Sequence, residues 1–216
     1  MTPEQKRAID QLREDVRNEV NEKRYRHILG VEETAVEMLF LCSDVLLDPF
    51  DDSEYTVRAA ALLHDVTKNK GEGWYERFLF EESIDAPDDE KNSPELLHAL
   101  TAPAYIAKAY PGFAAPTILS AVFKHTTGDG EMSLFDKILC LADYIAKGRT
   151  HSSCVELRER FFSFDFSSAS KEEKIKHLDS VLLESLKRTV AHLEENGKVP
   201  AKRTLCAVKV LGEGSK

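Results

Sequence analysis

A histidine and an aspartate stand side by side at the end of an apolar segment, Arg58–Ala–Ala–Ala–Leu–Leu–His64–Asp65. Neighbouring residues on a helix point about 100° apart, so both side chains can reach one centre only where the helix ends at the pair. A neutral imidazole and a carboxylate are both good ligands for a divalent metal. Because such a dipeptide also arises by chance, its significance depends on what other residues accompany it.

Two more residues of the same kinds lie in apolar helical surroundings. His27 faces the side of a predicted helix where the core should be, and Asp143 falls in the final turns of a strongly apolar helix. A single histidine in such a place is usually a core residue with a satisfied hydrogen bond. Several buried titratable groups, however, are hard to tolerate without a cation to neutralise them. Two imidazoles and two carboxylates suit iron, manganese or zinc acting on an oxygen-rich substrate: His27, His64, Asp65 and Asp143.

The elements that must position these residues are predicted to be helices. Capping residues and apolar side chains at helical spacing predict the helix starts. The predicted starts are Thr2, Glu22, Ser53, Trp74, Ser93, Pro116, Ser133, His151 and Ser170. The second helix is expected to reach Leu47 and to be ended by Asp48–Pro49. The tail from Thr204 is expected to be a short strand or an extended arm, and the fold class is expected to be all-α.

Residues 66–93 are the least regular part of the chain, with an acidic, turn-rich stretch from Asp85 to Ser93. A segment of this kind beside a suspected site can act as a lid or as a wall for a substrate. A solvated connection is an equally good interpretation.

Composition limits the classes of partner. The chain has 216 residues, 42% of them hydrophobic and 31% charged, with a net charge of −9. This charge argues against a nucleic acid polymer or an anionic membrane surface as partner, and a phosphate substrate would need local Lys and Arg. The four cysteines form no CxxC pair and are expected to be small buried residues in a reducing compartment. With no signal-peptide core or membrane-spanning run, we expect a cytoplasmic protein.

The order His27 … His64–Asp65 … Asp143 resembles that of the HD-domain metal-dependent phosphohydrolase superfamily. Within it, flanking motifs are similar to those of the YqeK-type HD hydrolases, which are symmetrical diadenosine tetraphosphatases. The resemblance covers about residues 20–150. Its motifs are Arg24–Tyr–Arg–His27, Ala61–Leu–Leu–His64–Asp65–x–x–Lys68, Glu95–Leu–Leu–His98, His125–Thr–Thr–Gly128 and Ala142–Asp143–Tyr–Ile.

The resemblance implies a helical bundle in which His27, His64, Asp65 and Asp143 hold a divalent metal, iron in this family. It also implies that basic and polar side chains surround the nucleotide phosphates: Arg24, Lys68, His98, His125, Thr126 and Arg149. The spacing of the cations agrees, since Arg24 lies one helical turn before His27 and Lys68 lies three residues after Asp65.

The implied reaction is the hydrolysis of diadenosine tetraphosphate to two ADP, for which the metal and Asp65 are needed. His98 and His125 stay open between three roles: binding a second metal, contacting phosphate, or protonating the departing ADP. Two alternatives remain at this point. One is an HD phosphohydrolase for another nucleotide, such as a nucleoside monophosphate or an alarmone, and the other is a non-catalytic nucleotide sensor.

The expected organisation has an N-terminal helix at residues 1–20, which packs on an HD domain at residues 21–150 carrying the metal site. A C-terminal helical extension follows at residues 151–216, where the resemblance is poor. A homodimer is left open. Asp129 stands where the family usually has an Arg, so either this loop points away from the phosphates or the substrate preference differs.

Overall fold

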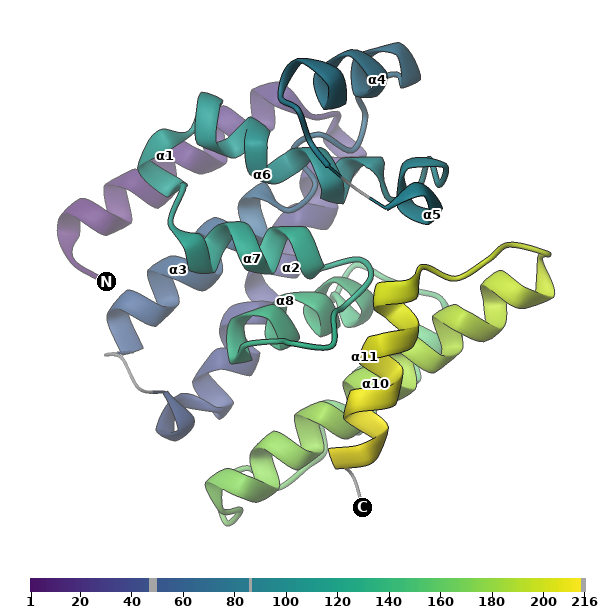
Figure 1. The fold of residues 1–216 in the computed structure, drawn as a ribbon. Helices are drawn as coiled ribbons and strands as arrows, with labels where there is room; N and C mark the ends of the chain where they lie inside the picture. Colours follow the sequence, from purple (N-terminus) through teal and green to yellow (C-terminus); the bar gives the residue numbers. More distant parts are fainter. Residues whose placement is uncertain (47–49, 86, 215–216) are drawn as a thin grey trace.

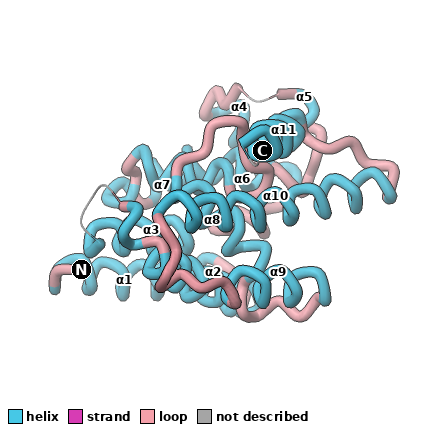
Figure 2. The backbone as a smooth tube through the Cα atoms, turned by 90° about the horizontal axis from the view of Figure 1, so that it is seen from below, coloured by secondary structure: helices cyan, strands magenta, loops and turns pink. Residues whose placement is uncertain are grey.

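The computed structural model describes residues 1–46, 50–85 and 87–214, and every regular element in them is helical (Figures 1 and 2). The predicted all-α class is therefore confirmed. Short 3₁₀ turns at Ser43–Val45 and Pro111–Phe113 supplement the α-helices. The helices are α1 (Pro3–Glu19), α2 (Glu22–Leu41), α3 (Phe50–Leu63), α4 (Glu72–Glu81), α5 (Asp88–Lys91), α6 (Leu97–Ala109), α7 (Pro116–Lys124), α8 (Leu134–Ile145), α9 (Ser152–Phe162), α10 (Lys171–Glu195) and α11 (Lys202–Gly214).

The centre of the bundle is formed by α2, α3, α7 and α8. Helix α2 packs on α3 and α8, and α7 packs on α3, α6 and α8. The long helix α10 then covers α8 and carries α9 and α11. One apolar cluster runs through all of these contacts, from Ile9 in α1 to Leu211 in α11. Because burial of this apolar surface is the main stabilising term, the helix ends that carry the site are held in fixed places.

Three predicted helix starts are confirmed down to their hydrogen bonds. Thr2, Ser133 and Ser170 each accept a backbone N–H from the third helical residue, and each belongs to a full capping box. These caps satisfy donors that a helix cannot satisfy internally. The capping-box pattern predicts these helix starts correctly because its two partner residues lie within four residues of each other in the sequence.

The predicted bounds of the second and third helices are wrong. Helix α2 stops at Leu41, where the chain tightens into the 3₁₀ turn Ser43–Val45 instead of continuing to residue 47. The predicted terminator, Asp48–Pro49, lies outside the described residues. Helix α3 already begins at Phe50, so Ser53 lies inside it and is buried.

Two further local predictions are also wrong. Ser93 does not cap α6, because its hydroxyl donates to the carbonyl of Asp89, and the helix begins at Leu97. The tail is neither strand nor extended arm but helix α11, whose buried residues Thr204, Ala207 and Leu211 recur at helical spacing. That apolar stripe packs against α10, and this tertiary contact stabilises the helix.

Three of the cysteines, Cys42, Cys140 and Cys154, are buried as predicted, whereas Cys206 is exposed. Burial raises the pKa of the Cys42 thiol to about 11 and that of Cys140 to about 12. Such thiols stay protonated near neutral pH and act as small apolar side chains.

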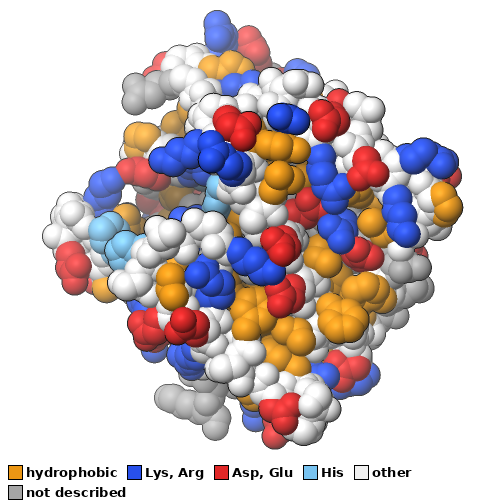
Figure 3. Space-filling view, turned by 180° about the vertical axis from the view of Figure 1, so that it is seen from behind, with side chains coloured by type: hydrophobic (Ala, Val, Ile, Leu, Met, Phe, Trp, Pro, Cys, Tyr) orange, Lys and Arg blue, Asp and Glu red, His pale blue; other side chains and the backbone are white. Residues whose placement is uncertain are grey.

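The surface mixes both signs of charge. On the face shown in Figure 3, Lys and Arg side chains alternate with Asp and Glu, and hydrophobic side chains reach the surface between them. None of the helices in the described ranges has the length and apolar character needed to cross a bilayer.

Candidate metal centre

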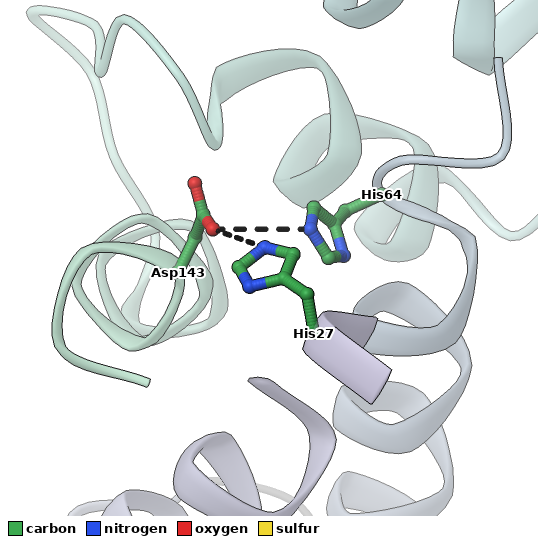
Figure 4. A group of neighbouring side chains, drawn as sticks. All are labelled: His27, His64 and Asp143. Carbon is green, nitrogen blue, oxygen red and sulfur yellow. Dashed lines mark ion pairs between the residues drawn. The ribbon is translucent and has the colours of Figure 1, made fainter. Parts of the chain in front are cut away.

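The His64–Asp65 pair lies directly after α3, which ends at Leu63. The following turn lets both side chains point to one centre, as the sequence predicts. His27 comes from the first half of α2, and Asp143 comes from the last turn of α8. Figure 4 shows the carboxylate of Asp143 turned toward the rings of both histidines. Three helices that are separate in the sequence therefore deliver their side chains to one point.

The distances within this centre are short. Asp143 Oδ1 lies 2.9 Å from His27 Nε2 and 4.0 Å from His64 Nε2. Asp65 Oδ2 lies 3.4 Å from His64 Nε2 and 3.8 Å from His27 Nε2. The two imidazole rings are 5.6 Å apart between centroids. The ligand atoms of His27, His64 and Asp143 lie within 4.8 Å of one another, a spacing at which they could hold one ion.

A second group of imidazoles adjoins the first through Asp65. Its other oxygen, Oδ1, lies 3.2 Å from His98 Nε2 and 3.8 Å from His125 Nε2. The Nε2 atoms of His98 and His125 are themselves 3.1 Å apart. His64, Asp65 and His125 form a further set whose ligand atoms are close enough for an ion. Asp65 is thus the carboxylate that links the two groups.

The chemistry of the donors fits a divalent cation. The Nδ1 atom of His64 lies 2.6 Å from the carbonyl of Ala61, which assigns the ring proton to Nδ1 and leaves the Nε2 lone pair facing the centre. The buried Nε2 atoms of His27 and His64 have no hydrogen bond of good geometry within the described residues. The buried lone pair of His64 faces the carboxylates of Asp65 and Asp143 without a hydrogen-bond donor, and a metal ion would satisfy it.

The carboxylates of the centre are ionised. Burial raises the pKa of Asp65, but the nearby imidazoles of His64 and His98 outweigh it and hold that pKa well below its usual range. Burial likewise raises the pKa of Asp143, and the contact with His27 and the charge of Arg149 outweigh it. Both groups therefore present negative oxygens at neutral pH.

The imidazoles of the second group are neutral. Burial lowers the pKa of His125 to about 4. Burial also lowers the pKa of His98 well below its usual range. Thr126 completes this group, with its Oγ1 2.9 Å from His125 Nε2 and 3.2 Å from His98 Nε2.

Three of the predicted phosphate-binding cations surround the centre. Arg24 Nη1 donates to Asp65 Oδ2 at 2.5 Å, and Arg149 donates to both the side chain and the carbonyl of Asp143. Lys68 Nζ lies 3.0 Å from His98 Nδ1. Burial lowers the pKa of the Lys68 ammonium. The structure thus brings together every residue that the sequence nominates for the site.

Comparison with known proteins agrees with this geometry. Residues 24–148, more than half of the chain, match the model of the HD domain. The chain belongs to the HD-domain family. A crystal structure from Clostridium acetobutylicum is similar over nearly the whole chain. That protein is described as a predicted HD superfamily hydrolase involved in NAD metabolism, and it matches with a TM-score of 0.77 and 28% identity over 94% of this chain and 96% of its own.

Three curated relatives of this HD-domain protein bear one name, symmetrical bis(5'-nucleosyl)-tetraphosphatase. The protein of Halalkalibacterium halodurans is 32% identical over 66% of this chain and 71% of its own. The Bacillus subtilis protein is 27% identical over 93% of this chain and 95% of its own. The Staphylococcus aureus protein is 28% identical over 86% of this chain and 84% of its own. The chain is accordingly a hydrolase of the HD-domain family.

Asp129, which departs from the family pattern, has a structural partner in this HD-domain chain. Its Oδ2 lies 3.8 Å from Nη1 of Arg203 in α11. The carboxylate is therefore directed toward a cation of the C-terminal helix. Gly128, just before it, has φ +64, and this positive φ turns the chain away from α7.

Sequence reasoning missed residues that hold the HD-domain site in place. Thr67, between Asp65 and Lys68, donates its buried hydroxyl to the carbonyl of His98. Tyr75 in turn donates to the carbonyl of Thr67 at 2.5 Å. Thr67 could have been nominated from its place between the candidate ligand Asp65 and Lys68. The role of Tyr75 depends on how α4 packs, which no local signal reveals.

Arg158 is another residue that sequence reasoning missed. Its guanidinium donates to three carbonyls at the end of α8 and just beyond it: those of Ile145, Ala146 and Arg149. A cation at this position satisfies carbonyls that the helix end leaves free and opposes the negative end of the helix dipole. It therefore fixes the segment that carries both Asp143 and Arg149.

Replacing Arg158 with Ala is expected to lower turnover about tenfold while the chain stays folded, because the Arg149 segment loses its anchor. Steady-state kinetics beside circular dichroism would measure this. The matched control is Arg160→Ala, which should change turnover little. Arg160 lies on the exposed face of α9, and its guanidinium donates to the Ser180 hydroxyl of α10. Equal activity of the two variants would contradict the anchoring role.

Proposed function

We propose that this hydrolase cleaves dinucleoside polyphosphates, with diadenosine tetraphosphate as the substrate and two ADP as the products. The observation that carries the proposal is the clustering of three cations, Arg24, Lys68 and Arg149, around an ionised His/Asp centre in a chain of net charge −9. Such a local positive field suits a polyphosphate. The shared name of the three relatives supports the same substrate class.

We further propose that His27, His64, Asp65 and Asp143 hold a divalent cation, with iron as first candidate and manganese and zinc as alternatives. When bound, a cation of this kind acts as a Lewis acid on phosphoryl oxygen and lowers the pKa of water. The close approach of the ligand atoms of His27, His64 and Asp143 supports this assignment, and Asp65 Oδ2 lies 3.4 Å from His64 Nε2 beside them.

The side chains around the centre would bind the phosphoryl oxygens and protonate the leaving group. Arg149 and Arg24 each keep N–H groups beside a ligand carboxylate and can also hold phosphoryl oxygens as charge develops. Lys68, next to His98, can neutralise the phosphate group that becomes the terminus of ADP. The adjoining pair His98 and His125 could then donate a proton to that leaving group, because an entering polyanion raises the pKa of a neutral imidazole.

The test is product analysis with anaerobically purified protein and diadenosine tetraphosphate. Two ADP per substrate consumed would agree with the proposal. ATP with AMP, or inorganic phosphate, would point to another bond or another nucleotide substrate. Tight nucleotide binding with full metal and no cleavage would favour a sensor and contradict the proposal.

Removal of the metal by a chelator is expected to abolish hydrolysis and to lower the melting temperature. Without a cation, the ionised carboxylates of Asp65 and Asp143 lose a neutralising charge, and the imidazole nitrogens beside them lose the partner of their lone pairs. Iron, manganese and zinc are then added back singly, with metal content and turnover measured for each. Full activity of the metal-free protein would contradict a metal mechanism.

A further inference from the structure

A large pocket opens next to the second imidazole group. Its volume is about 780 Å³, within the range of about 300–1,000 Å³ that is usual for small-molecule sites. Thr126 lines the pocket and also contacts His98 and His125, so one end of the pocket reaches the candidate site directly. The far end is formed by the C-terminal part of the chain.

The walls of the pocket come from two distant segments. One wall is the stretch around α5 and the start of α6, with Pro94 and Leu96; the other joins the end of α10 to α11, with Leu193, Val199 and Ala201. Figure 1 shows α5 opposite the start of α11. Apolar side chains thus face one another across the pocket, a setting that suits a flat aromatic ring.

Charge separates the pocket from the metal centre. The cations Arg24, Lys68 and Arg149 lie at the centre, whereas the lining of the pocket has three carboxylates, Asp88, Asp89 and Glu95, and one cation, Lys198. Glu95 is paired with Lys198, and Asp89 accepts the backbone N–H of Lys202. A phosphate chain is therefore favoured at the centre and disfavoured in the pocket. An uncharged nucleoside has no such conflict, and carboxylates can accept its hydroxyl and amino protons.

The pocket is held open by contacts between its two walls. Arg203 of α11 donates two hydrogen bonds of 2.6 Å to the fully buried carboxylate of Glu90 in α5. The same guanidinium lies 3.9 Å from the ring centroid of Phe123. Because these contacts fix the walls before any ligand arrives, binding needs little reorganisation.

We infer that this pocket binds the nucleoside end of the nucleotide while its phosphates lie at the metal centre. This inference rests on the proposed function for the identity of the nucleotide. It assigns the segment from Thr189 to Thr204 a direct part in substrate recognition. It also explains how an acidic chain can hold both ends of an ADP: one end by charge, the other by apolar contact.

The test compares calorimetric binding of two probes, ADP and inorganic tripolyphosphate, to the metal-loaded protein. The variant Leu193→Glu places a carboxylate on the apolar wall, and the matched control Leu205→Glu places one on the exposed face of α11, outside the pocket. We expect Leu193→Glu to lower the affinity for ADP at least ~10-fold and the affinity for tripolyphosphate less than ~3-fold. Leu205→Glu should leave both unchanged.

A second variant tests the same inference if Leu193→Glu does not fold. Val199→Glu alters the mouth of the pocket at a loop position that is 79% exposed. It should lower the affinity for ADP more than the affinity for tripolyphosphate. Unchanged ADP affinity in folded variants, or equal weakening of both probes, would overturn the inference. Wild-type protein that binds ADP through this pocket but releases no ADP from diadenosine tetraphosphate would contradict the proposed function alone.

Discussion

Replacement of Asp65 by alanine is expected to remove the metal and to lower turnover by about 10³-fold or more. Its Oδ2 faces the two imidazoles of the metal centre, and its Oδ1 faces His98 and His125. Arg24 also donates to it. Loss of one carboxylate therefore removes a ligand, a neutralising charge and the link between the two groups of imidazoles.

Metal content per chain and turnover of diadenosine tetraphosphate measure this effect together. Asp65→Asn keeps the volume of the side chain and removes its charge, so it separates loss of a ligand from loss of packing. Asp10→Ala, at an exposed carboxylate of α1, is the control and should resemble wild type. Full metal and full activity in Asp65→Ala would remove the basis of the proposed metal centre.

Replacement of Arg203 by alanine is expected to lower the free energy of unfolding by about 3–5 kcal/mol. Glu90 has no exposed surface, so removal of the guanidinium leaves a buried carboxylate without its cation. The contact with the face of Phe123 is lost as well. Urea denaturation followed by circular dichroism measures the change.

Arg188→Ala is the matched control for this ion pair. Arg188 also makes two hydrogen bonds to a single carboxylate, that of Glu156, but this partner is exposed to solvent. Water solvates a carboxylate left alone at the surface, so the loss should be much smaller. The double variant Arg203→Met with Glu90→Leu should recover most of the stability. A loss for Arg203→Ala no larger than for Arg188→Ala would show that the buried pair contributes little.

The clustering of the four candidate metal ligands could be predicted from the sequence because its signals are local. The caps of Ser133 and Ser170 lie within four residues of their partners, and the apolar spacing fixes which face of each helix turns inward. His64 and Asp65 fall where an apolar helix ends, so their convergence follows from a short stretch of chain. The proximity of the other two candidate ligands, His27 and Asp143, was then inferred from the order of the motifs along the chain.

The pocket could not be predicted, because its determinants are far apart in the chain. Glu90 lies in an acidic, turn-rich stretch whose sequence fits a lid or substrate wall and a solvated connection equally well, and its partner Arg203 stands 113 positions later. The helical stripe of Thr204, Ala207 and Leu211 is too short and too weakly apolar to outweigh a strand-like composition. Tertiary packing decides such segments, and one sequence does not reveal it.

The order in which the ribosome releases the chain has a consequence for this architecture. All of the proposed metal ligands, residues 27 to 143, emerge before α11, which closes the pocket through Arg203. A nascent chain could thus acquire its cation before it has a complete wall for the nucleoside. Since domains tend to fold from the N-terminus during synthesis, ADP affinity should be gained only in the last stage of translation.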